Sequence, residues 1–132
     1  MSKYLTREQI LTVDDMIKEE VPVPEWGGTV LVKRLSGEER DRYEDSLYKQ
    51  EGKKYKLTVN NIKARLAAYS IIDENGNRIF TEVDIAELGK KSAKALNRVA
   101  DVCRKLSGFT DEDMNELTKN SEATTTEDSP SA

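Results

Sequence analysis

The sequence of 132 residues contains no histidine and a single cysteine, Cys103. The absence of histidine excludes a Ser-His-Asp or Cys-His catalytic arrangement and removes the commonest general base and metal ligand. A lone cysteine excludes an internal disulfide and a multi-cysteine metal site. Because Cys103 stands among Val99, Val102 and Leu106, we expect a buried, inert thiol; a redox role would need an exposed, electropositive setting, for which Arg104 is weak support.

Long apolar runs and phosphate-binding glycine motifs are also missing. No stretch approaches the roughly 18 apolar residues of a membrane span, and the N-terminus lacks a signal-peptide core. Neither GxxxxGK[ST] nor GxGxxG occurs. The carboxylate pairs, such as Asp14-Asp15 and Glu38-Glu39, are explained as helix caps, dipole partners or solvated faces. We therefore predict a cytoplasmic protein that is not an enzyme and needs no cofactor or metal.

Charged residues make up 35% of the chain and hydrophobic residues only 36%, with a net charge of -4 and a pI near 5.0. This composition predicts a thin core under a charged surface, which suits assembly with partners better than a deep enzyme cleft. The acidic balance argues against a nucleic-acid binder, which normally carries a basic face. The lysines at 53, 54 and 56 stand beside Glu51 and are interpreted as a solvated loop.

Two capping boxes mark helix starts in the first third of the chain. Thr6 with Gln9 predicts a short helix, and Ser36 with Glu39 predicts a second one that runs to about Gln50. The second helix has a sparse apolar face, so we expect that face to be half-covered at best.

The stretch 19–35, EEVPVPEWGGTVLVKRL, predicts a β-hairpin between these helices. Its prolines cannot donate ladder hydrogen bonds, so the first arm should be an edge strand. Gly27 and Gly28 can supply the positive φ angles of a tight turn, which puts Trp26 at the end of the first arm.

From Thr58 a further helix is predicted, becoming extended over residues 70–72. The turn DENGNR at 73–78 then predicts a second small hairpin. A calcium loop is the alternative for this turn, but the twelve-residue calcium pattern wants glycine at its sixth position and Gly76 would be fourth.

The longest helix should run from Glu82 to Leu106, with Gly108 as its C-cap. Its apolar residues form a heptad seam, which fits an intramolecular core helix or a homo-oligomeric coiled coil. The members of the seam are Ile85, Leu88, Ser92, Ala95, Val99, Val102 and Leu106. After it, Thr110 should cap a short helix, and residues 121–132 are acidic and lack large apolar side chains.

These elements predict an α+β fold: a mainly helical small domain over residues 1–120 with two short β-hairpins, followed by a disordered acidic tail at 121–132.

The order of three motifs points to a family. PEWGGTVLVKRLSGEERDRYE comes first, then ARLAAYSIIDENGNRIF, then DIAELGKKSAKALNRVADVCRKLSGF. Over about residues 10–120 the chain resembles the tail assembly chaperones of long-tailed bacteriophages.

The resemblance implies a protein that binds the phage tape-measure protein, keeps it soluble and assists tail-tube assembly. It also implies action in the host cytoplasm and absence from the finished particle. A longer form made by ribosomal frameshifting would recruit the tail-tube protein, and the acidic end is where such an extension would be attached. Neither nucleic acid nor membrane is expected as a partner.

Trp26 is open to two interpretations: a plug packed on the hairpin and the first turn of the helix at Ser36, or an exposed anchor for an apolar partner helix. On the second interpretation the partner-binding residues are Trp26, Val30, Tyr43, Leu47, Ile85 and Leu88. Two other functions stay open, a small adaptor for one folded protein and a structural head-tail component retained in the particle.

Overall fold

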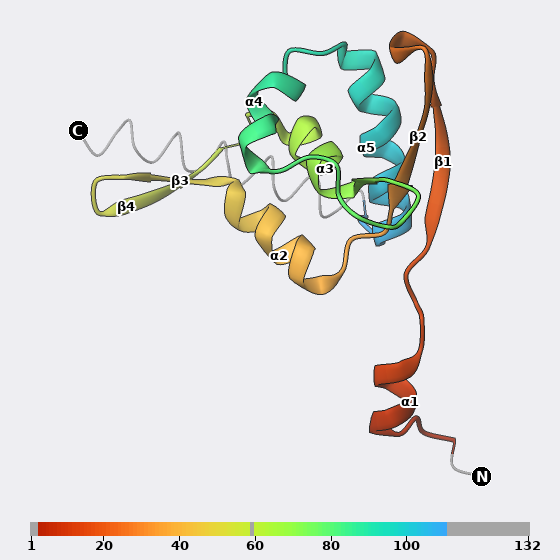
Figure 1. Ribbon diagram of the computed structural model, residues 1–132. Coiled ribbons are helices and arrows are strands. Elements are labelled where there is room, and N and C mark those ends of the chain that lie inside the picture. Colours follow the sequence, from red (N-terminus) through yellow and green to blue (C-terminus); the bar gives the residue numbers. More distant parts are fainter. Residues whose placement is uncertain (1–2, 59, 111–132) are drawn as a thin grey trace.

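The structure, a computed structural model, describes residues 3–58 and 60–110 (Figure 1). The elements in chain order are α1 (Arg7–Thr12), β1 (Lys18–Val23), the 3-10 turn η1 (Pro24–Trp26), β2 (Gly28–Lys33), α2 (Gly37–Ser46), β3 (Tyr48–Glu51), β4 (Lys54–Leu57), α3 (Ile62–Ser70), β5 (Ile71–Ile72), the 3-10 turn η2 (Glu82–Asp84), α4 (Ile85–Leu88) and α5 (Ala93–Ser107).

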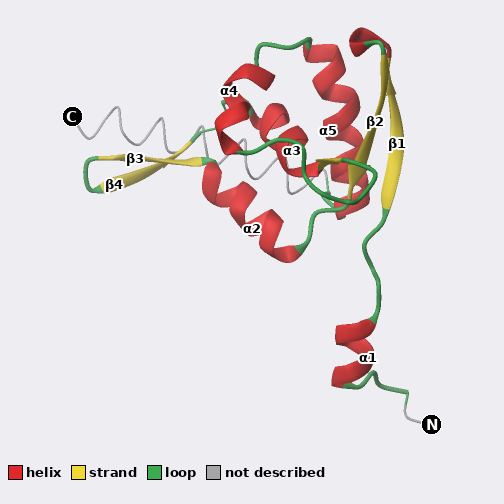
Figure 2. Ribbon diagram, viewed as in Figure 1, coloured by secondary structure: helices red, strands yellow, loops and turns green. Residues whose placement is uncertain are grey.

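The predicted α+β class is confirmed. Helices α2 to α5 gather on one side of the long β1–β2 hairpin, while α1 and the β3–β4 ribbon project away from this body (Figure 2). Within the described ranges, no helix has the length and apolar character needed to cross a membrane. Predictions that concern residues 111–132, the helix after Thr110 and the acidic tail, lie outside the described residues.

The β1–β2 hairpin forms as predicted, with β1 at the edge of a three-stranded sheet ordered β1-β2-β5. Its turn differs from the prediction. Val23 pairs with Gly28, so four residues form the connection, and only Gly27 has a positive φ, of 74°. Because proline fixes φ near a helical value, Pro24 opens a 3-10 turn that carries Trp26. Trp26 therefore lies in the turn and not at the end of the first arm.

The core lies between the sheet and the pair α3 and α5. Apolar side chains of β1 and β2 meet the buried face of α5, where Val99 and Cys103 have no exposed surface. The prediction that Cys103 is buried is confirmed, and burial raises the pKa of its thiol. A thiol held in this way stays protonated and unreactive.

The long helix predicted from Glu82 to Leu106 is wrong in its first half, since α4 ends at Leu88 and α5 begins at Ala93. Ser92 starts the new helix by accepting a hydrogen bond from the Ala95 amide at 3.3 Å. Gly89 allows close packing at the break, because a Cβ there would lie 2.9 Å from Cγ of Asn61. The heptad seam is therefore divided between two helices. Gly108 does cap α5, with a φ of 76°.

The helix that begins at Ser36 ends at Ser46 and not near Gln50, because the chain enters β3 at Tyr48. Its sparse apolar face is fully covered: Tyr43 and Leu47 are each only 1% exposed. Phe109, from the end of the described chain, covers Tyr43 with its ring 5.9 Å away. The expectation of a half-covered face is wrong, because the cover comes from a residue distant in sequence.

The second hairpin is found at β3–β4, where the sequence was interpreted as a solvated loop. The hairpin predicted around DENGNR is reduced to one bridge between Ile72 and Arg78, since β5 pairs mainly with β2. The turn itself forms, with the Asp73 carboxylate accepting hydrogen bonds from the backbone amides of Asn75 and Asn77 at 2.8 and 3.0 Å.

The helix predicted from Thr58 starts only at Ile62.

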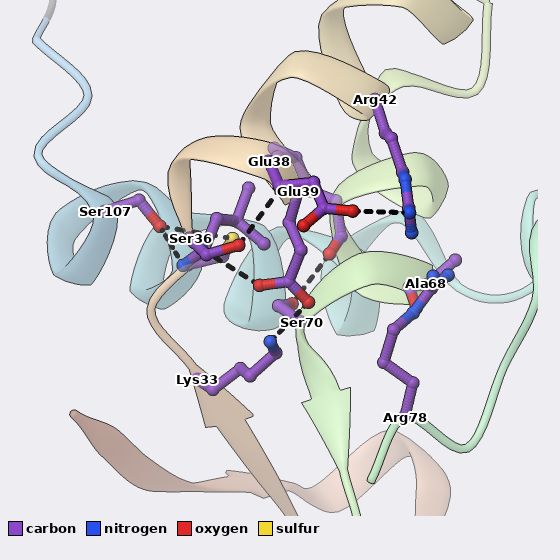
Figure 3. Close-up of polar contacts among 12 residues, drawn as sticks. Lys33, Ser36, Glu38, Glu39, Arg42, Ala68, Ser70, Arg78 and Ser107 are labelled. Carbon is purple, nitrogen blue, oxygen red and sulfur yellow. Dashed lines mark hydrogen bonds and ion pairs between the residues drawn. The ribbon is translucent and has the colours of Figure 1, made fainter. Parts of the chain in front are cut away.

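Polar contacts fix α2 between the sheet and α5 (Figure 3). Glu39 accepts hydrogen bonds from the Lys33 ammonium and the Ser36 amide. Although burial raises the pKa of Glu39, these contacts outweigh it and leave the pKa below its usual value. The Leu35 amide donates to Ser107 Oγ at 3.0 Å, which joins the start of α2 to the end of α5.

Candidate partner-binding surfaces

A hollow of about 360 Å³ opens beside the tip of the β1–β2 hairpin. Trp26, Phe80 and Leu88 give it apolar walls. Two carboxylates and one lysine, from Asp84, Glu87 and Lys91, complete its lining. We call this site the Trp26 groove. Apolar walls combined with a few charged residues are typical of a site that binds a row of apolar side chains.

The hairpin tip that carries Trp26 is fastened to α5. Nε and Nη2 of Arg98 donate to the two oxygens of the Glu25 carboxylate, at 2.9 and 3.0 Å. The hydrogen bonds from Arg98 hold the pKa of Glu25 below its usual value. A bidentate pair restrains orientation as well as distance, so one wall of the groove is held in place relative to α5.

The opposite wall of the groove is built at the start of α4. Asp84 accepts a hydrogen bond from the Thr81 amide at 2.8 Å, closing a capping box. This box sets η2 and α4 so that Leu88 is buried on the core side while Glu87 stays exposed.

Trp26 itself is half-buried and packs against the core, and its indole nitrogen has no hydrogen-bond partner among the described residues. Its neighbours in the groove come from α4 and from residues on either side of it. None of the lining residues belongs to α2, so the groove is not built on the helix that begins at Ser36.

The six predicted partner-binding residues do not share one surface. Trp26 and Leu88 line the groove, and Val30 is half-buried beside the core. Ile85 is in the core at 7% exposure, and Tyr43 and Leu47 are enclosed under α2.

A second apolar surface, which the sequence patterns did not indicate, is the N-terminal arm, residues 3–17. Helix α1 has no buried residue and stands away from the body (Figure 1). The large apolar side chains of the arm are between 39% and 72% exposed; they are Tyr4, Leu5, Ile10, Leu11, Val13, Met16 and Ile17. The available signal was a cluster of large apolar residues with neither helical nor strand periodicity.

The root of the arm is held by Arg34. Its Nε donates to the Leu106 carbonyl at 2.7 Å, and its Nη1 donates to the Asp15 carbonyl. The backbone amide of Arg34 donates to the carbonyl oxygen of Ile17 at 2.8 Å. The arm therefore starts from a fixed point at the end of α5.

Together these features define a small binding domain with open apolar surfaces. The sequence matches the model of the phage tail assembly chaperone family over residues 6–120, so the chain belongs to that non-catalytic family, as the motifs indicated. Among solved structures, the chain is similar to the tail assembly chaperone of bacteriophage HK97, at 17% identity, with 79% of this chain and 95% of that one covered and a TM-score of 0.53. At that identity the likeness concerns the fold. No curated protein matches the sequence.

Proposed function

We propose that this chaperone binds the phage tape-measure protein and keeps it soluble while the tail assembles in the host cytoplasm. The observation that carries the proposal is the Trp26 groove, an apolar hollow left open between a restrained hairpin tip and α4. A row of apolar side chains on a client helix fits such a site, with the charged rim limiting self-association. Val30 and Ile85 are not among the residues that line the groove, and they pack in or against the core.

The N-terminal arm supplies further apolar contact. Exposed apolar area of this kind is unfavourable in water, and a client that covers it gains roughly 25 cal/mol for each Å² buried. The arm can therefore bind along a client helix after the groove has taken one anchor. Recruitment of the tail-tube protein by a longer form is a proposal that rests on the family. Self-association into oligomers is a proposal that rests on the heptad seam.

Co-expression with a tape-measure fragment from the same genome tests the proposal. We expect a soluble complex, and loss of the client from pull-downs when Lys91 is replaced by tyrosine, because a large ring at the rim narrows the groove without removing core atoms. Lys53→Tyr, at an exposed position in the turn of the β3–β4 ribbon and outside the lining, is the control and should retain the client. Trp26→Ala should also lose the client, with thermal unfolding as the check that it folds.

A fragment that stays insoluble with the unchanged chaperone would contradict tape-measure binding. Capture of one folded protein at fixed stoichiometry would favour an adaptor. Detection of the chain in purified mature tails would favour a structural component.

A further inference from the structure

The β3–β4 ribbon is a projecting element with two chemically different faces (Figure 1). Since side chains alternate along a strand, Tyr48, Gln50 and Tyr55 share one face. The other face carries the lysines at 49, 54 and 56 with Glu51 among them, and Lys53 is in the turn. Every residue of β3 is exposed, and only Leu57 at the base is buried.

The ribbon carries four lysines and one carboxylate. Glu51 is the single carboxylate in the ribbon and is opposite Lys54. Within residues 3–58 and 60–110, no ion pair involves Lys49, Lys53 or Lys54. A two-stranded ribbon is marginally stable by itself, so a partner that neutralises the lysines would also stabilise it.

The complementary charge is in the same chain. The sequence from 111 to 132 contains seven carboxylates and one lysine, a net charge of -6. Since the whole chain has a net charge of -4, residues 1–110 have a net charge of +2. The acidic character of the protein therefore belongs to its last segment, and the folded body is slightly basic.

The chain leaves the body close to the ribbon. Phe109 packs on α2, with its ring 5.9 Å from that of Tyr43 and 4.3 Å from the Arg40 guanidinium. Helix α2 leads into β3 five residues after Tyr43, roughly 8 Å along a helix axis. The ribbon adds roughly 10 Å, and an extended chain spans about 3.3 Å per residue, so the carboxylates from Glu116 onward can reach the lysines.

We propose that the acidic segment 111–128 docks on the lysine face of the β3–β4 ribbon of its own chain. The interaction is intramolecular, and a short tether raises the effective concentration of the segment to about the millimolar range, so individually weak ion pairs suffice. The docked segment covers the ribbon and competes with any acidic partner for the same lysines. This inference does not depend on the tape-measure proposal.

The test uses the full chain and a zero-length carbodiimide reagent, which joins lysine to carboxylate only where the two touch. We expect cross-links from Lys49 or Lys54 to carboxylates of residues 111–128. Their yield should fall severalfold when salt is raised from about 0.05 M to about 0.5 M, because screening then acts within a few Å. Neutralising Glu116, Glu122, Glu127 and Asp128 as amides should shift the NMR amide signals of residues 48–57.

Matched variants test whether the cross-links depend on the ribbon lysines and not on exposed lysines elsewhere. Lys49→Glu with Lys54→Glu should abolish the cross-links to the acidic segment. Lys90→Glu with Lys94→Glu, an exposed pair beyond the ribbon, should leave them unchanged. Mixing isotope-labelled and unlabelled chains reports whether the cross-links join two copies. Cross-links that join copies, unchanged ribbon signals in the amide variant, or no ribbon cross-links at low salt would each overturn the proposal.

Discussion

The helical body and the N-terminal arm use large apolar side chains in opposite ways. In the body, residues as far apart in sequence as Val23 and Val99 are fully buried in one core. In the arm, comparably large side chains such as Leu5 and Leu11 remain exposed. The body uses its apolar residues for stability and the arm leaves its own available to a partner. Substitutions should therefore affect folding in one region and leave it almost unchanged in the other.

The largest expected effect is at Tyr43 in the body. Tyr43→Ala removes a buried ring and should lower the free energy of unfolding by about 3–5 kcal/mol. Tyr4→Ala in the arm should change it by less than about 0.5 kcal/mol. Urea denaturation of both variants measures the difference. A comparable loss at Tyr4 would show that the arm packs on the body.

Tyr43→Phe is the control for the ring itself. The buried hydroxyl has no hydrogen-bond partner among the described residues, and burial raises the pKa of Tyr43 to about 12. Replacing it by hydrogen should be neutral or stabilising by about 1 kcal/mol, because an unsatisfied buried group is removed.

A smaller effect is expected where α3 meets the break between α4 and α5. Gly89→Ala places a methyl group against the Asn61 side chain and should cost about 1–3 kcal/mol. Adding Asn61→Gly should restore stability, because glycine tolerates the φ of 58° at that position and leaves space for the methyl group. Gly37→Ala, where nothing is within 4 Å, is the matched control. A loss that Asn61→Gly does not rescue would contradict the contact.

The smallest effect should come from the Glu25–Arg98 pair at the hairpin tip. The pKa of Glu25 is lowered in the folded protein, so its contribution to stability is present above the usual carboxyl pKa of 4.5 and is lost as the pH falls through the folded value. Thermal unfolding of Glu25→Gln should differ from the unchanged protein at pH 6, and the difference should shrink as the pH falls through the lowered pKa of Glu25.

The features predicted correctly from the sequence are local. Capping boxes at Thr6 and Ser36 need only residues three positions apart, and both form. The errors involve distant partners. Phe109, which is distant in sequence, covers Tyr43. At the break in the long helix, the Asn61 side chain lies so close to Gly89 that a larger residue would not fit there. Four of the six predicted site residues, Tyr43, Leu47, Ile85 and Leu88, are buried for the same reason, since burial depends on what packs above a face.

Arg34 gives the molecule a mechanical property. One guanidinium holds the carbonyl of Asp15 at the root of the arm and that of Leu106 at the end of α5. A pull on the arm is therefore shared between α5 and the edge strand β1, into which the arm continues. Because β1 could be peeled from β2 one pair at a time, the share of the load that α5 takes reduces the force on the sheet edge. The anchor lets the exposed arm bear tension while the sheet stays closed.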